Sequence, residues 1–241
     1  MEIKVMTFNI HHGKGTDKKV NLNRIAEVIR RSNPDVIGLN EVDKHFSKRS
    51  LFVDQAGWLA NELNMDFVFS PSISIQSNQA ADKGQYGNAL LSRYPIFSKE
   101  IHLFKYQSRL NENRSLIDAS IIINGQLVQF NVTHLSLNPF LHRKQIDYLV
   151  NQSQKYSHPI IIMGDLNMKP GSIGWLQLTQ QYKDAWKAAG NGPGSTYPSR
   201  NPKNRLDYIY ASPFLKVREA EVVSQIPAAS DHLPLTATLS S

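Results

Sequence analysis

Polar side chains recur along this chain at the points where short apolar runs end. Such groups are costly to bury, so a carboxylate, amide or imidazole beside a buried strand usually has a partner or a task. Strand ends are also where sites collect in layered α/β folds. Each instance is weak evidence alone, but together they predict one site assembled from distant segments. Six of these places occur in the sequence, at residues 7–11, 39–42, 132–135, 163–167, 206–209 and 230–234.

The residue types at these places favour a divalent cation bound through oxygen. Carboxylates and amides are hard ligands that suit Mg²⁺ or Mn²⁺, which keep several waters and bind phosphate oxygens. The chain has no cysteine, which excludes a disulfide scaffold, a thiolate zinc site and a cysteine nucleophile. The sequence therefore predicts Mg²⁺ (or Mn²⁺) as the cofactor.

The net charge points to an anionic partner. The 241 residues include 27 Lys and Arg against 20 Asp and Glu, a formal charge of +7. This excess favours nucleic acid, anionic lipid headgroups or phosphorylated metabolites as partners. Two basic loops next to the candidate strand ends are expected to line opposite sides of a substrate groove. The first loop carries Lys14, Lys18 and Lys19, and the second carries Arg200, Lys203 and Arg205.

The elements that must position these groups follow from hydrophobic periodicity. A helix is predicted from Leu22, capped by Asn21 and ended by Asn33-Pro34, and a second across 52–63. A third opens at Asn138-Pro139. The Asn124-Gly125 pair predicts a hairpin turn. Short strands are predicted at 3–8, 35–39, 88–91, 96–103, 116–123, 127–132, 159–163, 206–210, 217–223 and 233–239.

This mixture of strands and helices predicts one domain over residues 1–241, with two packed sheets and helices on their outer faces. No run approaches the ~18 apolar residues that a membrane helix needs. The first residues, Met1 to Lys4, lead directly into a strand-like run rather than a signal peptide. We therefore expect a cytoplasmic protein, without stable membrane insertion, that acts as a monomer.

The ordered motifs resemble those of the endonuclease/exonuclease/phosphatase superfamily, whose members include DNase I-like nucleases, deadenylases, sphingomyelinases and inositol-phosphate phosphatases. The resemblance runs from Thr7 to Leu235. It implies an α/β (α+β) fold, the DNase I-like four-layer α/β sandwich of two packed mixed β-sheets flanked by helices. The most specific matches are Gly164-Asp165-Leu166-Asn167 and Ser230-Asp231-His232-Leu233-Pro234-Leu235, with support from Arg205-Leu206-Asp207-Tyr208-Ile209 and Asn40-Glu41-Val42.

The resemblance assigns a metal site and a nucleophile site. It implies that Glu41 is the main metal ligand, with Asn9 and Asp231 close to the ion. Asp165 would position or deprotonate the attacking water. Asn167 would hydrogen-bond the phosphate and hold the nucleophile in line.

Two histidines are implied on either side of the phosphate. His232 would be a general base or a cationic stabiliser of the transition state, with Asp207 fixing its tautomer. His134 would protonate the leaving group or stabilise charge. The sequence leaves open which histidine is the acid and which the base.

Three further residues are candidates for substrate binding. Asn88 would touch the phosphate, although strand packing explains its motif equally well. Arg114 matches a family arginine ahead of a strand and would bind phosphate, the alternative being a surface ion pair. His11 stands where AP endonucleases place an aspartate, and it would serve the substrate or support the ligands.

Where the sequence differs from particular branches of the family, it argues against the functions of those branches. His134 argues against abasic-site repair, and the surroundings of Asp207 lack the tryptophan and cysteine typical of inositol-polyphosphate phosphatases. The leading hypothesis is a nuclease that cleaves DNA or RNA by in-line attack of an activated water. The alternative is a phospholipid or sphingomyelin phosphodiesterase, suggested by the aromatic stretch 102–106. A catalytically silent binding protein is the third hypothesis.

Overall fold

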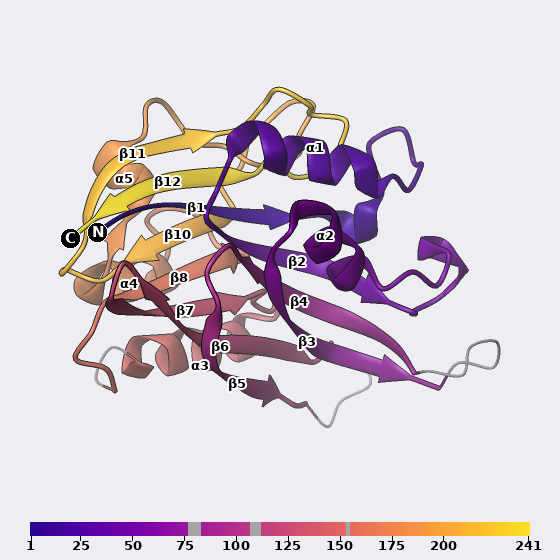
Figure 1. Cartoon of the computed structure of the whole chain (residues 1–241). Coiled ribbons are helices and arrows are strands. Elements are labelled where there is room, and N and C mark those ends of the chain that lie inside the picture. The colour runs from indigo at the N-terminus through magenta and orange to yellow at the C-terminus, as the bar shows by residue number, and fades with distance from the viewer. Residues whose placement is uncertain (77–82, 107–111, 153–154) are drawn as a thin grey trace.

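Apolar runs of the chain form two six-stranded sheets that pack face to face, with helices on their outer faces (Figure 1). The structure is a computed structural model that describes residues 1–76, 83–106, 112–152 and 155–241. The arrangement is the predicted four-layer α/β sandwich. The two termini lie side by side at one end of the strands (Figure 1), where the Met1 ammonium donates to Ser241 Oγ at 3.0 Å.

The first sheet has the order β11-β12-β1-β2-β4-β3. Strands β1 and β2 are parallel, and the other neighbours are antiparallel. Helix α1 makes the crossover between the two parallel strands. The strands are β1 (Glu2–Asn9), β2 (Val36–Lys44), β3 (Asp66–Ile75), β4 (Gly84–Ser92), β11 (Lys216–Val222) and β12 (Leu235–Ser240).

The second sheet repeats this plan in the order β5-β6-β7-β8-β10-β9. Its parallel pair is β7 and β8, with helix α3 as the crossover. Asn124 (φ 50°) and Gly125 (φ 79°) form the predicted turn between β6 and β7. The strands are β5 (Ile96–Phe104), β6 (Arg114–Ile123), β7 (Gln126–Thr133), β8 (Ile160–Asp165), β9 (Lys183–Asp184) and β10 (Asp207–Ala211).

The helices begin and end at local capping signals. Asn21 accepts a hydrogen bond from the backbone N–H of Arg24, and Asn33 ends α1 in the left-handed conformation, as the sequence predicts. Asp54 caps α2 in the same way, so this helix begins later than residue 52. The α-helices are α1 (Leu22–Ser32), α2 (Gln55–Leu63), α3 (Pro139–Gln152), α4 (Ile173–Gln181) and α5 (Ala185–Ala189), and two 3₁₀ turns cover His11–Gly13 and Lys48–Ser50.

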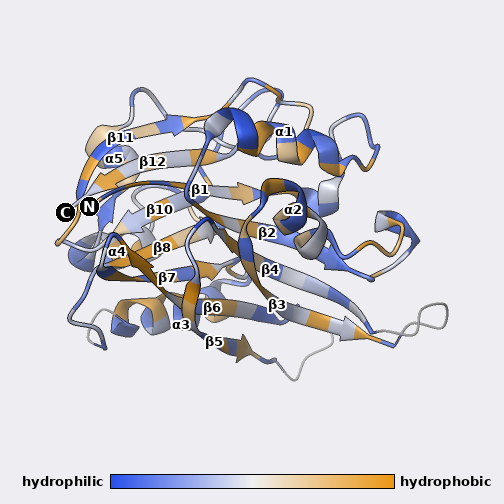
Figure 2. Ribbon diagram, viewed as in Figure 1, coloured by the Kyte–Doolittle hydropathy of each residue, from blue (hydrophilic) through white to orange (hydrophobic). Residues whose placement is uncertain are grey.

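Three apolar clusters hold the four layers together. One lies between the sheets and includes Val132, Met163 and Leu235. The second packs α1 and α2 on the first sheet, and the third packs α3 and α4 on the second. Figure 2 shows apolar residues along the strands and mixed polar and apolar residues along α1 and α2. No helix among the described residues is both long and apolar enough to cross a membrane.

The sheets approach closely at Gly38 of β2. A Cβ atom there would lie 2.9 Å from Cγ of Met163 in β8 and 3.1 Å from Val132 in β7. The methionine side chain therefore fills the space that a larger residue at 38 would need. Gly38 lies two residues before Asn40 and three before Glu41, two polar residues of the same strand.

Candidate active site

The predicted site residues meet where the two parallel strand pairs end. Asn9, the last residue of β1, is fully buried and donates through Nδ2 to Glu41 Oε1 at 3.0 Å and to Asp165 Oδ2 at 3.1 Å. Glu41 belongs to the first sheet and Asp165 ends β8 in the second. One amide therefore connects the two sheets at the carboxyl ends of their parallel strands, the usual position for a site in such folds.

Glu41 projects from a bulge in β2. The register with β4 shifts between Leu39 and Val42, and Glu41 has a left-handed backbone, with φ 57°. A non-glycine residue in this region is strained, and such strain concentrates at functional positions. The bulge lengthens β2 beyond the predicted residue 39 and turns the Glu41 carboxylate toward Asn9.

A buried amide, Asn40, ties this bulge to the second sheet. Its Oδ1 accepts the backbone N–H of Asp165 at 2.8 Å, and its Nδ2 donates to Asn88 Oδ1 at 2.8 Å and to the Thr133 carbonyl at 3.1 Å. Sequence reasoning missed Asn40 as a site residue, although it stands within the Asn40-Glu41-Val42 motif. Its three long-range bonds show that it positions Asp165.

Asp165 ends β8 and Asn167 follows it, because Gly164 allows an unusual backbone. Gly164 has φ 150°, and a Cβ there would lie 1.8 Å from the Thr133 carbonyl oxygen. The N–H of Asn167 donates to Asp165 Oδ1 at 3.0 Å, and Asn167 Nδ2 donates to the Leu135 carbonyl at 2.9 Å. This turn therefore presents both side chains at one end of the strand.

The two histidines flank Asp165. Nε2 of His134 lies 3.5 Å and Nε2 of His232 lies 3.7 Å from Asp165 Oδ2. Asn167 Nδ2 lies 3.0 Å from His134 Nε2. Burial, followed by the positive charges of Arg114 and His232, lowers the pKa of His134 well below its usual value. His134 is therefore neutral, and its Nε2 accepts the amide proton of Asn167.

His232 has the opposite charge state. Its Nδ1 donates to Oδ2 of the fully buried Asp207 at 2.8 Å. Burial alone lowers its pKa, but Asp207, with smaller effects from Asp165 and Asp231, outweighs burial and raises the pKa of His232 to about 10. Burial and then the Asp207 carboxylate raise the pKa of Asp165 to about 7.

A second set of donors surrounds Glu41. One ligand atom each from Glu41, His11 and His12 lies within 4.8 Å of the others. His11 Nδ1 is buried, has no hydrogen-bond partner among the described residues and lies 3.5 Å from Asp231 Oδ1. Burial, with the charge of Arg49 next, lowers the pKa of His12 to about 4, so its ring is neutral. This set of carboxylates and an unpartnered imidazole nitrogen fits a divalent cation.

Asn9, which the resemblance places close to the ion, uses both ends of its amide within the site. Its Oδ1 accepts the backbone N–H of His11 at 3.1 Å, and its Nδ2 serves Glu41 and Asp165. In this arrangement Asn9 orients the two carboxylates. Asp231 lies on the other side, held by Ser199, whose N–H donates to the Asp231 carbonyl at 2.7 Å.

The predicted substrate residues fall in different environments. Asn88 is buried, and its amide is used by Asn40 and by Ser115, whose carbonyl accepts at 2.9 Å, so the packing interpretation of this residue applies. Arg114 is 6 % exposed, pairs with Glu112, and has a buried Nε without a partner among the described residues. Of the three candidates, only His11 lies directly at the carboxylate cluster.

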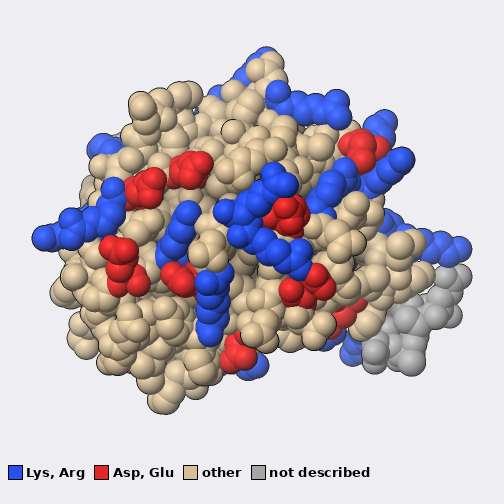
Figure 3. Space-filling view, turned by 45° about the horizontal axis from the view of Figure 1, so that its top comes forward, with Lys and Arg blue, Asp and Glu red and all other residues tan. Residues whose placement is uncertain are grey.

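The two basic loops lie together, which contradicts the prediction that they line opposite sides of a groove. Arg200 Nε donates to Thr16 Oγ1 at 2.8 Å, so both loops form one side of the site. Arg205 is buried and pairs with Asp184 at 2.8 Å, which removes it from any groove. On the face that Figure 3 shows, Lys and Arg side chains are interspersed with carboxylates.

The three rings of the stretch 102–106 face the protein, while Leu103 and Lys105 between them are exposed. The rings of His102 and Phe104 lie 5.3 and 5.4 Å from that of Tyr148 in α3. The hydroxyl of Tyr106 accepts from Gln145 Nε2 at 2.9 Å. These rings pack on α3, so the stretch does not support the membrane-docking role that the sequence suggested.

One neighbour of the site had no signal in the sequence. The ring of Tyr197 lies 4.8 Å from that of His232, at 45° between their planes. The loop that carries it is held by Thr196, whose carbonyl accepts the Leu233 N–H at 2.8 Å. A tyrosine in a polar loop far from every strand end gives no indication of this position.

Comparison with known proteins agrees with the geometry. The model of the endonuclease/exonuclease/phosphatase family matches residues 6–232. An uncharacterized Escherichia coli protein, YbhP, is 25 % identical over 253 residues, covering 98 % of this chain and 95 % of that one. An endonuclease/exonuclease/phosphatase from Beutenbergia cavernae superposes with a TM-score of 0.83 and 25 % identity, over 99 % of this chain and 71 % of that one. Another, from Bacteroides vulgatus, has a TM-score of 0.80 and 19 % identity, over 100 % and 99 % of the two chains.

Proposed function

This chain belongs to the endonuclease/exonuclease/phosphatase family, and from that premise we propose that it is a phosphodiester hydrolase dependent on Mg²⁺ or Mn²⁺. The observation that carries the proposal is that the Nε2 atoms of His134 and His232 both lie within 3.7 Å of Asp165 Oδ2. The cluster of Glu41, His11 and His12 lies beside them. Residues from six separate strand ends supply this arrangement. Packing alone gives no reason for so many ionisable groups to meet.

The cation would be held by Glu41 with Asp231 and His11, which offer carboxylate oxygens and an imidazole nitrogen. When bound, it polarises the phosphate and neutralises charge on the leaving oxygen. The neutral ring of His12 lies in the same cluster. Asn9 fixes the Glu41 carboxylate through its 3.0 Å hydrogen bond.

Asp165 is the base in this proposal. A carboxylate whose pKa is raised to about 7 is matched to proton transfer near neutral pH. The water oxygen forms a bond to phosphorus as its proton passes to Asp165, and the bond from phosphorus to the ester oxygen breaks. Asn167 Nδ2 is used by the Leu135 carbonyl and by His134, so its Oδ1 accepts from the attacking water and holds it in line.

His232 is the cationic group and the proton donor in this proposal. Paired with Asp207, it stays protonated at neutral pH and so stabilises the negative charge that develops on the phosphate and the leaving oxygen. The leaving oxygen takes its proton from this ring or from solvent. His134, neutral and bonded to Asn167, positions that amide. In this proposal His232 is the cationic group and neither histidine is the base.

Nucleic acid is the first substrate class that we propose. The loops joined by Arg200 and Thr16 carry the exposed cations Lys18, Lys19 and Lys203 on the Asp231 side of the site. Asp17, the acidic residue among them, is already paired with Arg24 at 2.8 Å. Unpaired cations beside the site suit contact with phosphates along a polynucleotide.

Phospholipid is a second candidate, favoured by one specific observation. A large pocket whose exposed lining surface is mainly apolar adjoins Asn167. An apolar subsite beside a scissile phosphate suits an ester with an apolar substituent.

A substrate panel tests the reaction and its substrate. Single- and double-stranded DNA, RNA and phospholipid vesicles are incubated with Mg²⁺ or Mn²⁺, and the product ends are identified. We expect turnover that EDTA abolishes and that Asp165→Asn reduces by about 10³-fold or more, while the matched exposed control Asp66→Asn keeps full activity. No turnover of any phosphodiester, together with no binding of Mn²⁺ in calorimetry with phosphate present, favours the silent binding protein.

A further inference from the structure

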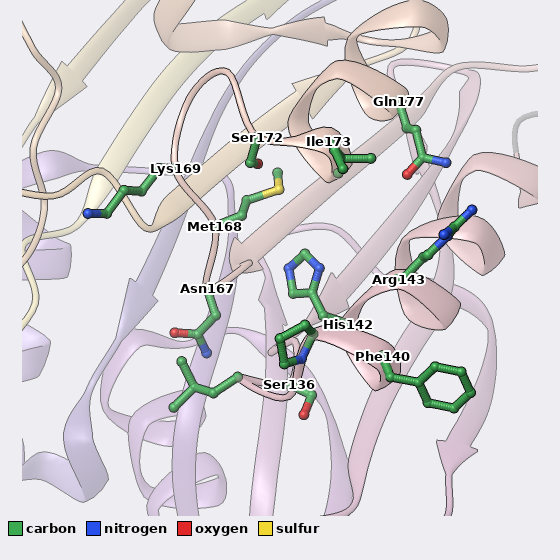
Figure 4. Close-up of a pocket in the computed structure, with 13 residues that line it drawn as sticks. Ser136, Phe140, His142, Arg143, Asn167, Met168, Lys169, Ser172, Ile173 and Gln177 are labelled. Carbon is green, nitrogen blue, oxygen red and sulfur yellow. The ribbon is translucent and has the colours of Figure 1, made fainter.

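A pocket of about 680 Å³ lies between the first turns of α3 and α4, on the outer side of the second sheet. Figure 4 shows Asn167 at one end of this pocket and Phe140, Arg143 and Gln177 at the other. Since Asn167 also lies 3.0 Å from His134, the pocket adjoins the active site at this residue. A substrate whose phosphate binds at the site can therefore place a substituent in the pocket.

The walls of the pocket are fixed by packing between the two helices. His142 Nε2 donates to the Leu166 carbonyl at 2.8 Å. A Cβ atom on Gly174 would lie 3.1 Å from Ile146 and 3.2 Å from His142, so α4 starts in close contact with α3. A pocket held in this way exists before any ligand binds, which lowers the entropic cost of binding.

The lining is mostly apolar and its mouth is open to solvent. Leu137, Phe140 and Ile173 are 76, 65 and 74 % exposed, and the nearly buried Met168 forms part of the inner wall. Exposed large apolar side chains that gather at one place mark a surface that binds an apolar partner. Here three of them border a single pocket.

Cations surround these apolar groups. Arg143 lines the far end, and Lys169 extends on the Asn167 side (Figure 4). Lys144 Nζ lies 4.4 Å above the Phe140 ring. None of the described lining residues is acidic, and the carboxylate of Asp147 is bonded to Gln177 Nε2 at 3.2 Å. The pocket is therefore complementary to a molecule that is apolar and also negatively charged.

We propose that this α3–α4 pocket binds the aliphatic part of an anionic phospholipid, with Leu137, Phe140 and Ile173 inserted among the lipids at the membrane surface. Apolar residues flanked by Lys and Arg are the usual composition of such an interfacial surface. A nucleobase is less well matched, because stacking platforms need aromatic faces. Among the described lining residues the aromatic rings are Phe140, one face of which Lys144 covers, and His142, whose imidazole is bonded to the Leu166 carbonyl.

The proposal rests on the phosphodiesterase function and specifies its second substrate class. The test is flotation of the full-length protein, with Mg²⁺ present, on vesicles of equal parts phosphatidylglycerol and phosphatidylcholine. We expect the double variant Phe140→Ser/Ile173→Ser to bind these vesicles about tenfold more weakly than the unsubstituted chain. Phosphatidylcholine alone should bind less protein, and so should Arg143→Gln/Lys169→Gln on the mixed vesicles.

The matched control is Phe97→Ser/Phe214→Ser, which removes two other exposed rings, 69 and 62 % exposed, away from the pocket. This variant should bind vesicles as the unsubstituted chain does, and thermal melts should show that all variants fold. Equal losses in the two double variants, or no binding by the unsubstituted chain, would overturn the proposal. So would a pocket variant that loses affinity for single-stranded oligonucleotides and keeps its affinity for vesicles.

A separate assay distinguishes failure of this inference from failure of the proposed function. Turnover of the water-soluble diester bis(p-nitrophenyl) phosphate by the unsubstituted chain tests hydrolysis without a membrane. Hydrolysis without vesicle binding removes the lipid pocket and leaves the phosphodiesterase. Vesicle binding lost in the pocket variant, with no hydrolysis of any diester, supports the pocket and removes the enzyme.

Discussion

Nδ1 of His232 donates a 2.8 Å hydrogen bond to Oδ2 of Asp207, and both side chains are buried. The carboxylate stabilises the imidazolium, so this histidine keeps its proton well above the pH at which a free imidazole loses it. Asp207 begins β10 directly opposite Asp165 on β8. The pair therefore places both an imidazolium and a second carboxylate beside the proposed base.

The charge of His232 is directly measurable. In the metal-free protein we expect its ring to remain doubly protonated through pH 8, because its pKa is raised to about 10. The Asp207→Asn variant removes the largest stabilising charge and leaves the burial, so the pKa of the ring should fall well below 10. Ring ¹⁵N shifts across a pH series report both states. A wild-type ring that deprotonates near pH 6.5 would contradict the assignment of His232 as the cationic group.

Glu41 is predicted to dominate metal affinity. We expect Glu41→Gln to weaken Mn²⁺ binding by about 10²-fold, since it replaces an anionic ligand with a neutral one of the same shape. Calorimetry with phosphate present measures this without reference to activity. The control is Glu27→Gln, which removes a surface carboxylate paired with Arg31. Similar affinities in the two variants would show that the cation lies elsewhere.

His11 is predicted to set the preference between metals. An imidazole nitrogen favours Mn²⁺ over Mg²⁺, which prefers an all-oxygen environment. We expect His11→Asp to lower the ratio of Mn²⁺ to Mg²⁺ affinity by about tenfold, measured by competition titration. A ratio that does not change would place the His11 ring outside the coordination sphere.

Asn40 is predicted to be important for stability as well as for activity. In Asn40→Ala the Asp165 N–H and its other partners lose a buried bond, at about 1–3 kcal/mol for each group left unsatisfied. We expect the free energy of unfolding in urea to fall by about 3 kcal/mol. The control Asn61→Ala, on the exposed side of α2, should change it by less than about 0.5 kcal/mol. Equal effects would mean that the buried amide network contributes little.

The burial of His142 is predicted to lower the free energy of unfolding in acid. Burial lowers its pKa, partly offset by its bond to the Leu166 carbonyl. The folded state therefore binds fewer protons than the unfolded state, so this contribution is complete above about pH 6.5 and lost as the pH falls below it. The His142→Gln variant, which can still donate to Leu166, should show a smaller decrease in unfolding free energy between pH 7 and pH 5. Parallel profiles would contradict this.

The sequence was sufficient for the features that depend on local signals. The caps of α1 at Asn21 and Asn33 and the Asn124-Gly125 turn depend on residues that are neighbours in the chain. The strand ends could be predicted as a site because parallel strands bring their carboxyl ends to one edge of a sheet. Strand β3 and helix α4 were not predicted, because Pro71 and the scattered apolar residues of 173–181 obscure their periods.

Contacts between distant segments were beyond local reasoning. Arg205 was interpreted as a groove residue, but Asp184, 21 positions earlier, pairs with it inside the protein. The bond between Arg200 and Thr16 spans 184 positions and places two loops on one side. The role of Asn40 depends on a partner 125 residues away. Such pairings require the tertiary fold, because nothing in the neighbouring residues indicates them.

The missing side chain at position 38 has a consequence for catalysis. Met163, two residues before Asp165 in β8, occupies the space beside Gly38, which lies three residues before Glu41 in β2. A larger side chain at position 38 would push the two sheets apart. It would widen the gap across which Asn9 donates to Glu41 and Asp165. The distance between Asp165 and Glu41 therefore depends on the thickness of the apolar layer beneath them, and Gly38 keeps that layer thin.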